Sequence, residues 1–222
     1  MSTYVLMRLL ESAPRRYDLG IRLLTLGRLD RAYERLTRQI EAGQRVLDIG
    51  CGTGALTLRA AARGAVVKGI DVNSQMLEIA ERRARQTHRA GDIVLAEMGV
   101  AELDREGVES YDVVTSGLCF SELSEDEVAY TLRQVVRILK PGGLLLVADE
   151  FRPRNVIGRV LHRLVRTPLA VLTYLLTQQT TQAIANLPAR LRAVGLEIVS
   201  LRTSLLGSFT ELVARKPAAG GP

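Results

Sequence analysis

A run of nine residues from Val46 to Gly54 constrains the fold of this chain more than any other feature. It joins an apolar strand segment, an acid at Asp48 and alternating glycines that include Gly50 and Gly52, directly ahead of an alanine-rich stretch. Glycines two residues apart let a chain turn sharply off a strand, and they let a ligand approach backbone amides that a Cβ would shield. The run therefore predicts a strand, a ligand-binding loop and a helix in succession.

Asp48 distinguishes between the two kinds of cofactor that bind at such a turn. Gly50, Gly52 and Ala55 satisfy the glycine fingerprint of dinucleotide enzymes, whose third position accepts alanine. A carboxylate two residues before Gly50 would lie close to the pyrophosphate and repel it. The same carboxylate suits a ligand with an ammonium group, because charge-assisted hydrogen bonds are stronger than neutral ones. S-adenosylmethionine carries such a group and no phosphate, so the loop favours it over NAD.

A second acid, Asp71, ends the apolar segment that begins at Ala65. Asp71 lies 23 residues after Asp48. Nucleotide-binding folds place a ribose-binding acid roughly 20 residues beyond the glycine loop, at the end of the next strand. Asp71 is therefore expected to accept hydrogen bonds from ribose hydroxyls, with Val72 against the adenine face. Ser74 is expected to cap the helix that follows.

These motifs resemble those of the class I S-adenosylmethionine-dependent methyltransferases, and the likeness runs from about Tyr17 to Lys216. Tyr111 to Val114 resembles the fourth strand of that family, and Leu139 to Gly143 resembles the turn before its fifth strand. The resemblance implies an α/β fold, a Rossmann-like sheet of seven mostly parallel strands with helices on both faces. It also implies S-adenosylmethionine as the methyl donor.

One motif departs from the family pattern. Gly99 stands where an aspartate of the family commonly binds the adenine amino group. Two replacements remain open, the carboxylate of Glu97 and the backbone amide of Val100. The residues expected to bind the donor are Asp48, Gly50, Cys51, Gly52, Thr53, Gly54, Asp71, Val72, Met76, Gly99, Val100 and Ser116.

Strands and helices are expected to alternate from Arg45 onward, as in a parallel sheet covered on both faces. A helical N-terminal cap (1–42) is expected before the methyltransferase domain (43–216), and a disordered tail (217–222) after it. The expected helices are Ala55–Arg63, Ser74–Arg85 and one opened by a capping box of Ser124 and Glu127 and continuing to Leu139. The expected later strands are Ile93–Ala96, Leu144–Ala148, Leu196–Arg202 and Ser208–Ala214, with the last antiparallel.

A helical insertion (151–186) is expected to cover the pocket as a lid, together with the N-terminal cap. The insertion interleaves arginines with aliphatic residues, so it can pack as an amphipathic lid or lie peripherally against a membrane.

The flanking segments narrow the resemblance to the ubiquinone and menaquinone biosynthesis methyltransferases. The similar residues are Tyr17, Tyr174 and the stretches 23–27 and 187–191. This implies a small or lipid-like methyl acceptor, quinone-like in chemistry. The N-terminal segment also resembles methyltransferases associated with corrinoid proteins. The alternative is accordingly that the protein has the methyltransferase fold but acts as a partner or regulator of another protein, such as a corrinoid protein, and transfers methyl groups weakly or not at all.

Methyl transfer from a sulfonium mainly requires that donor and acceptor be positioned and desolvated. Where the acceptor must lose a proton, a general base helps. The candidate catalytic residues are Glu122, Glu150 and Tyr17, with Tyr174 and His162 as further candidates.

Composition excludes several other classes. The net charge is +6, but only 4% of residues are aromatic and tryptophan is absent, so base stacking on nucleic acid is not favoured. Cys51 and Cys119 are far apart and form no metal-type pair. No apolar run is long enough to cross a bilayer, which indicates a cytoplasmic protein with at most peripheral membrane contact. The sequence predicts no oligomeric state.

Overall fold

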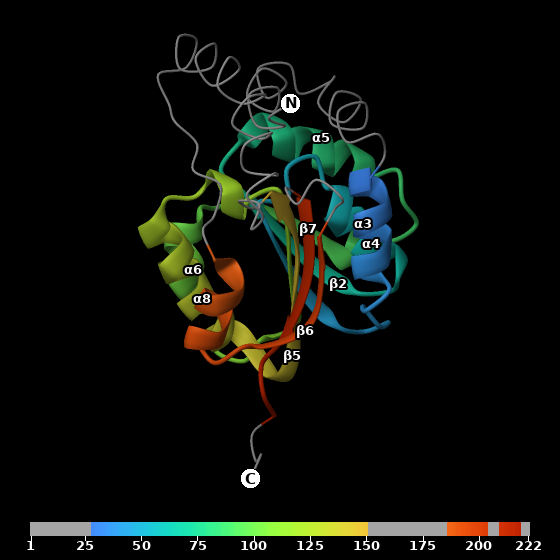
Figure 1. Ribbon diagram of the computed structural model, residues 1–222. Helices are drawn as coiled ribbons and strands as arrows, with labels where there is room; N and C mark the ends of the chain where they lie inside the picture. The colour runs from blue at the N-terminus through green and yellow to red at the C-terminus, as the bar shows by residue number, and fades with distance from the viewer. Residues whose placement is uncertain (1–27, 151–185, 204–208, 219–222) are drawn as a thin grey trace.

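The computed structural model describes residues 28–150, 186–203 and 209–218, and these residues form an α/β domain around a seven-stranded sheet (Figure 1). The strand order is β3-β2-β1-β4-β5-β7-β6. The order reverses between β1 and β4, which creates the crevice where ligands bind in open α/β sheets. The strands are β1 (Arg45–Ile49), β2 (Val66–Asp71), β3 (Ile93–Glu97), β4 (Tyr111–Gly117), β5 (Leu139–Glu150), β6 (Glu197–Thr203) and β7 (Phe209–Arg215).

The five neighbouring strands β3, β2, β1, β4 and β5 pair in parallel. Strand β7 is antiparallel to both of its neighbours, β5 and β6. The predicted Rossmann-like, mostly parallel sheet of seven strands is therefore confirmed, as is the antiparallel last strand. Parallel strands require covered faces, because the connections between them cross over the sheet.

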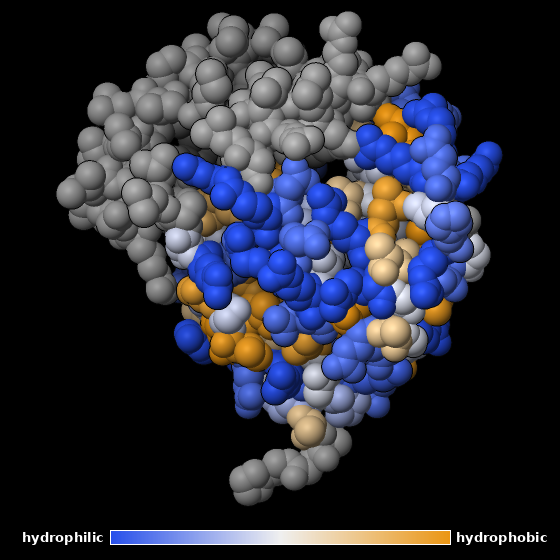
Figure 2. Space-filling view, turned by 90° about the vertical axis from the view of Figure 1, so that its right-hand side faces the viewer, coloured by the Kyte–Doolittle hydropathy of each residue, from blue (hydrophilic) through white to orange (hydrophobic). Residues whose placement is uncertain are grey.

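Helices cover both faces of the sheet (Figure 1). One face carries α3 and α4, and the opposite face carries α6 and α8. Figure 2 views the molecule from the side of α3 and α4, where hydrophilic residues cover most of the described surface. The helices are α3 (Arg28–Thr37), α4 (Ala55–Ala62), α5 (Ser74–Ala84), α6 (Glu125–Ile138) and α8 (Leu187–Ala193), with short 3-10 turns η1 (Ala90–Asp92), η2 (Val100–Arg105) and η3 (Phe120–Glu122).

The apolar strand residues alternate between two core clusters, one on each face of the sheet. In β1, Val46 packs with α3 and α4, whereas Leu47 and Ile49 pack with α6 and α8. All three side chains are buried. Fully burying a side chain of this size contributes about 1.5–3 kcal/mol. Because both faces of the sheet are buried, β1 needs apolar residues on both sides, and this explains its nearly continuous apolar sequence.

The capping of α5 differs from the sequence expectation. Asn73, not Ser74, is the N-cap, and its side-chain oxygen accepts hydrogen bonds from the amides of Gln75 and Met76. Asn73 has extended backbone angles, as a capping residue requires, whereas Ser74 is already the first helical residue. The predicted capping box of Ser124 and Glu127 at α6 is confirmed.

Strand β5 begins five residues earlier than predicted. Leu139 already pairs with Tyr111, and Leu144 pairs with Val113, so the intervening residues form an irregularity opposite Asp112. Gly142 takes a φ of 80° there and donates its amide to the Lys216 carbonyl. The turn predicted at Leu139 to Gly143 therefore lies within β5, because residues both before and after the irregularity pair with β4.

The expected N-terminal cap and lid are only partly described. Residues 1–27 and 151–185 lie outside the described residues, so the lid remains a prediction. Within the cap, α3 packs into the core with Tyr33 and Leu36 buried. Among the described helices, none combines the length and apolar character needed to cross a membrane.

Candidate functional site

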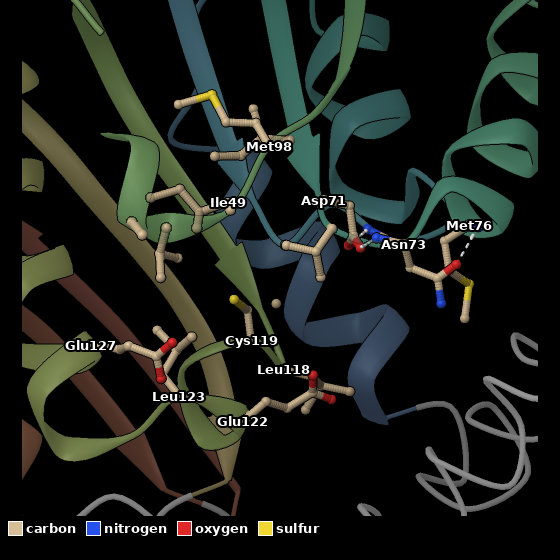
Figure 3. A pocket seen from close by; sticks show the side chains of 18 residues that line it. Ile49, Asp71, Asn73, Met76, Met98, Leu118, Cys119, Glu122, Leu123 and Glu127 are labelled. Atoms are coloured by element: carbon tan, nitrogen blue, oxygen red, sulfur yellow. Dashed lines mark hydrogen bonds between the residues drawn. The ribbon is translucent and has the colours of Figure 1, made fainter. Parts of the chain in front are cut away.

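A cavity of about 440 Å³ opens at the carboxyl ends of β1, β2 and β4, at the point where strand order reverses (Figure 3). Asp71, Asn73 and Met76 form one wall, and Glu122, Leu123 and Glu127 approach from another. This is the position at which open α/β sheets bind their ligands. The residues predicted to bind a donor or act in catalysis that line it are Gly50, Gly52, Asp71, Val72, Met76, Gly99, Val100 and Glu122.

The glycine loop needs glycine at Gly50 for two separate reasons. Its φ of +66° lies in the left-handed region, and a Cβ at this position would stand 2.5 Å from the Cβ of Cys119. Gly52 also has a positive φ of +51°, but a Cβ there would meet no atom within 4 Å. Gly50 therefore lets the loop after β4 approach, whereas Gly52 faces open space beside the cavity.

Three amides of this loop are engaged by the protein itself. The Cys51 amide donates to the carbonyl of Ile70 at 2.9 Å, and the Gly52 amide donates to Oδ2 of Asp71 at 2.8 Å. The Gly54 amide donates to the carbonyl of Cys51 at 2.9 Å. A pyrophosphate site needs amides directed at the phosphate. This arrangement argues against a dinucleotide and agrees with the preference derived from Asp48.

Asp71 ends β2 at the cavity wall (Figure 3). Its two carboxylate oxygens each accept one backbone amide, from Gly52 and from Asn73, both at 2.8 Å. A carboxylate has about four acceptor positions, so each oxygen retains capacity for one further donor. The two amides hold the carboxylate in one orientation, with its remaining acceptor capacity available to a diol.

Asp48 lies behind the cavity, and this corrects one expectation. Its side chain is fully buried at 0% exposure and is not among the residues described as lining the cavity. Thr57 Oγ1 donates to one oxygen at 2.6 Å and Thr115 Oγ1 donates to the other at 2.8 Å. Direct contact with an ammonium group is therefore not supported, because the carboxylate binds two hydroxyls inside the core. Asp48 instead ties β1 to α4 and β4 beneath the glycine loop.

Burial raises the pKa of Asp48 to about 6, and the hydrogen bonds from Thr57 and Thr115 partly oppose this effect. The buried carboxyl group of Asp48 therefore holds its proton more tightly than an exposed aspartate does.

The side of the cavity near β3 is apolar. Val72 is 71% exposed and lines the cavity, and a Cβ at Gly99 would stand 3.3 Å from its Cγ1. Val100 also lines the cavity, whereas Glu97 is exposed and is not among the described lining residues. Of the two replacements left open for the family's adenine-binding aspartate, the geometry favours the Val100 amide. The small Gly99 permits the close approach of Val72.

The loop after β4 carries Cys119 and Glu122 to the cavity. Leu118 has a φ of 59°, and the Ser121 amide donates to Oδ2 of the buried Asp149 at 3.1 Å. Burial raises the pKa of the Cys119 thiol well above its ordinary value, so this thiol is protonated near neutral pH. Cys119 is accordingly a packing residue of the cavity wall.

The other predicted residues are not among the described residues that line the cavity. Glu150 ends β5 with its side chain outside the described set, and Tyr17, Tyr174 and His162 lie outside the described residues. The predicted donor-binding residues that are not among the described lining are Asp48, Cys51, Thr53, Gly54 and Ser116.

Sequence reasoning missed several lining residues, among them Asn73, Met98, Leu123 and Glu127. Asn73 carries a usable signal, because it directly follows the strand-ending acid and its side chain favours caps. The others belong to segments whose approach depends on the fold.

The strand order, the antiparallel β7 and the cavity beside a glycine loop and Asp71 together define the fold of the class I S-adenosylmethionine-dependent methyltransferases. A solved structure of an S-adenosylmethionine-dependent methyltransferase from Methanosarcina mazei shares this fold, with a TM-score of 0.62 and 23% identity. The match covers 81% of this chain and 95% of that one.

Residues 46–143 match a family model described as a methyltransferase domain. A demethylmenaquinone methyltransferase from Tropheryma whipplei is 32% identical over 125 residues, covering 54% of this chain and 47% of the relative. A ubiquinone/menaquinone biosynthesis C-methyltransferase from Azotobacter vinelandii is 33% identical over 157 residues, covering 68% of this chain and 60% of the relative. The chain thus spans about half to three fifths of these relatives. The predicted resemblance to class I methyltransferases, and to this subgroup, is confirmed.

Proposed function

We propose that this protein is an S-adenosylmethionine-dependent methyltransferase that acts on a small or lipid-like acceptor of quinone-like chemistry. The observation that carries the proposal is the cavity at the ends of β1 and β2. It combines a glycine loop, three of whose amides already bind protein acceptors, and a carboxylate, that of Asp71, which is held at the cavity wall. These features suit a ligand that has a ribose and no phosphate.

The residues present fit the donor. Asp71 would accept hydrogen bonds from the ribose hydroxyls, while Val72 and Val100 would hold the adenine ring between an aliphatic surface and a backbone amide. The open space beside Gly52 would admit the amino-acid portion. When bound, the donor supplies a methyl group on a sulfonium, which is electrophilic without any activation by the protein.

The chain's own residues would mainly exclude water and orient the acceptor. Met98, Leu118 and Leu123 line the cavity and offer apolar surface to a flat or lipid-like molecule. Glu122 also lines it, on the loop after β4, and is our candidate for the general base when the acceptor must lose a proton. The similarity to a demethylmenaquinone methyltransferase and to a ubiquinone/menaquinone biosynthesis C-methyltransferase supports a quinone-like acceptor.

Isothermal titration calorimetry with S-adenosylmethionine, S-adenosylhomocysteine and NAD tests the donor assignment. We expect micromolar binding of the first two ligands and none of NAD. Asp71→Asn should weaken donor binding by about tenfold or more, because an amide replaces one acceptor oxygen with a donor. Asp126→Asn, at an exposed position of α6, is the matched control and should bind normally. Binding of NAD alone would overturn the proposal.

Transfer of a labelled methyl group from S-adenosylmethionine to a demethylated quinone precursor tests the acceptor. We expect label in the quinone ring and its loss in Glu122→Gln. Donor binding with no transfer to quinone-like or lipid acceptors would reject turnover. The alternative that the sequence left open, a methyl-donor-fold partner of another protein such as a corrinoid protein, would then be the better explanation.

A further inference from the structure

Gly117 ends β4 at the donor cavity, and a tyrosine of α3 occupies the space that a side chain at this position would need. A Cβ at Gly117 would stand 2.7 Å from Cζ and 2.9 Å from Cε1 of Tyr33, and it would stand closer still to the hydroxyl oxygen. The φ of Gly117 lies outside the left-handed region, so its backbone would accept an L side chain. Glycine is therefore required here by the room that Tyr33 occupies.

The ring of Tyr33 is held in place by the helices around it. Tyr33 is 6% exposed and belongs to the core cluster on the α3 and α4 side of the sheet. The guanidinium carbon of Arg59 in α4 lies 5.8 Å from the ring centroid, and a cation over an aromatic face is attracted to it. Arg59 in turn donates to Asp30 of α3 at 2.7 Å and to the carbonyl of Ala55 at 2.8 Å. The ring therefore has little freedom to move away from Gly117.

The contact between Tyr33 and Gly117 lies at the start of a loop that forms one wall of the donor cavity. Leu118, the next residue, is 4% exposed and packs in the same core cluster as Tyr33. Its amide donates to the carbonyl of Ala148 at 2.9 Å, which ties the start of the loop to β5. Because protein interiors are close-packed, a change of volume at Gly117 must shift its neighbours. The loop residues that line the cavity are Gly117, Leu118, Cys119, Glu122 and Leu123 (Figure 3).

We propose that Tyr33 is a positioning residue of the donor cavity, because the bulk of its ring sets where the loop from Gly117 to Leu123 stands. Tyr33 is not among the described lining residues, so it acts through Gly117 and Leu118. The inference rests on the proposed donor site. It goes beyond that site by making donor affinity depend on the packing of α3 against the end of β4.

Gly117→Ala in two backgrounds tests this role, with the affinity for S-adenosylhomocysteine measured by calorimetry. In the wild-type background the new Cβ collides with the ring and displaces the loop, so affinity should fall by about tenfold or more. Tyr33→Leu removes the three colliding atoms and leaves a void behind the loop, so it should weaken binding by about threefold or more. In the Tyr33→Leu background, Gly117→Ala fills part of that void and should not weaken binding further.

Tyr33→Phe separates the bulk of the ring from its hydroxyl. Phenylalanine keeps Cζ and Cε1 against Gly117, so this variant should bind S-adenosylhomocysteine within about twofold of wild type. A loss as large as that of Tyr33→Leu would assign the effect to the hydroxyl and overturn the role of the ring.

Two matched controls separate positioning from stability. Tyr111→Leu makes the same change at a similarly buried tyrosine, 4% exposed, at the other end of β4. It should lower the thermal unfolding temperature but change S-adenosylhomocysteine affinity by less than about twofold. Gly91→Ala adds a Cβ where no atom lies within 4 Å, and it should change neither quantity. Equal losses of affinity in Tyr111→Leu and Tyr33→Leu would reduce the effect to stability and overturn the inference.

The outcomes for the donor site and for Tyr33 are distinguishable. Wild-type protein that does not bind S-adenosylhomocysteine would overturn the proposed donor site, and the role of Tyr33 with it. Wild-type binding together with an equal loss from Gly117→Ala in both backgrounds would overturn the role of Tyr33 alone. A loss in wild type that disappears in the Tyr33→Leu background supports both.

Discussion

At the scale of single residues, Asp48 shows how a buried carboxylate can serve a site that it does not touch. Its oxygens bind Thr57 of α4 and Thr115 of β4, so it holds three elements together under the loop. Thr57 and Thr115 are distant from each other in sequence, which is why the sequence alone suggested a ligand contact instead. Only the pairing of β1 with β4 brings Thr115 to this carboxylate.

The raised pKa of Asp48 predicts a specific pH dependence of stability. Its folded-state pKa is about 6, above the unfolded value of about 3.9, so the folded state binds the proton more tightly. The contribution of this protonated carboxyl group to the free energy of unfolding is fully present below pH ~4 and is lost as the pH rises through ~6. Asp48→Asn removes this titration. The variant should therefore gain stability relative to wild type between pH ~4 and ~8, by about 3 kcal/mol at most.

Denaturant unfolding of both proteins across this pH range measures that difference. Asp126→Asn, an exposed substitution of the same kind in α6, serves as the control for the change from acid to amide. A constant difference between wild type and Asp48→Asn would contradict the prediction.

Gly50 and Gly52 form a second residue-scale comparison, because both have positive φ but only Gly50 is in close contact. Gly52→Ala should cost about 1–2 kcal/mol, the strain of a left-handed alanine. Gly50→Ala should cost about 1–3 kcal/mol more, because its Cβ would collide with Cys119. Denaturant unfolding checks the order of the two variants. In a Cys119→Gly background the additional cost should largely disappear, and its persistence would show that the contact is not responsible.

At the scale of elements, the start of α5 tests which residue caps the helix. Asn73→Ala should destabilise the protein by about 1 kcal/mol, because its side-chain oxygen accepts the amides of Gln75 and Met76. Ser74→Ala should change stability by no more than about 0.5 kcal/mol, since Ser74 already lies inside the helix. Thermal unfolding of the two variants measures both effects. A larger loss from Ser74→Ala would restore the cap that the sequence suggested.

Several features that sequence reasoning predicted correctly have a local cause. The glycine loop, the acid at the end of β2 and the capping box of α6 each depend on residues within a few positions of one another. The start of β5 was predicted wrongly because its register depends on pairing with β4 across the irregularity opposite Asp112. The approach of Cys119 to Gly50 likewise requires β1 and β4 to be adjacent. Local signals therefore predicted which residues form the loop, but not which distant side chains surround it.

At the scale of the whole molecule, the donor cavity joins segments that are far apart in the chain. Its walls come from the ends of β1, β2 and β4, from the residues after β3 and from the start of α6. A ligand bound there contacts only the folded state, so it must stabilise the domain as a unit. S-adenosylhomocysteine at about 100 times its dissociation constant should raise the free energy of unfolding by about 2.7 kcal/mol.

Thermal unfolding over a range of S-adenosylhomocysteine concentrations measures this stabilisation, and NAD at matched concentrations is the control ligand. The same titration of Asp71→Asn should show the curve shifted to about tenfold higher ligand concentration or beyond, because stabilisation follows the ratio of ligand to dissociation constant. The control variant Asp126→Asn should respond to S-adenosylhomocysteine as wild type does, since Asp126 is exposed in α6 and is not among the described lining residues. If Asp71→Asn kept the wild-type curve, the assignment of Asp71 to the donor would be wrong.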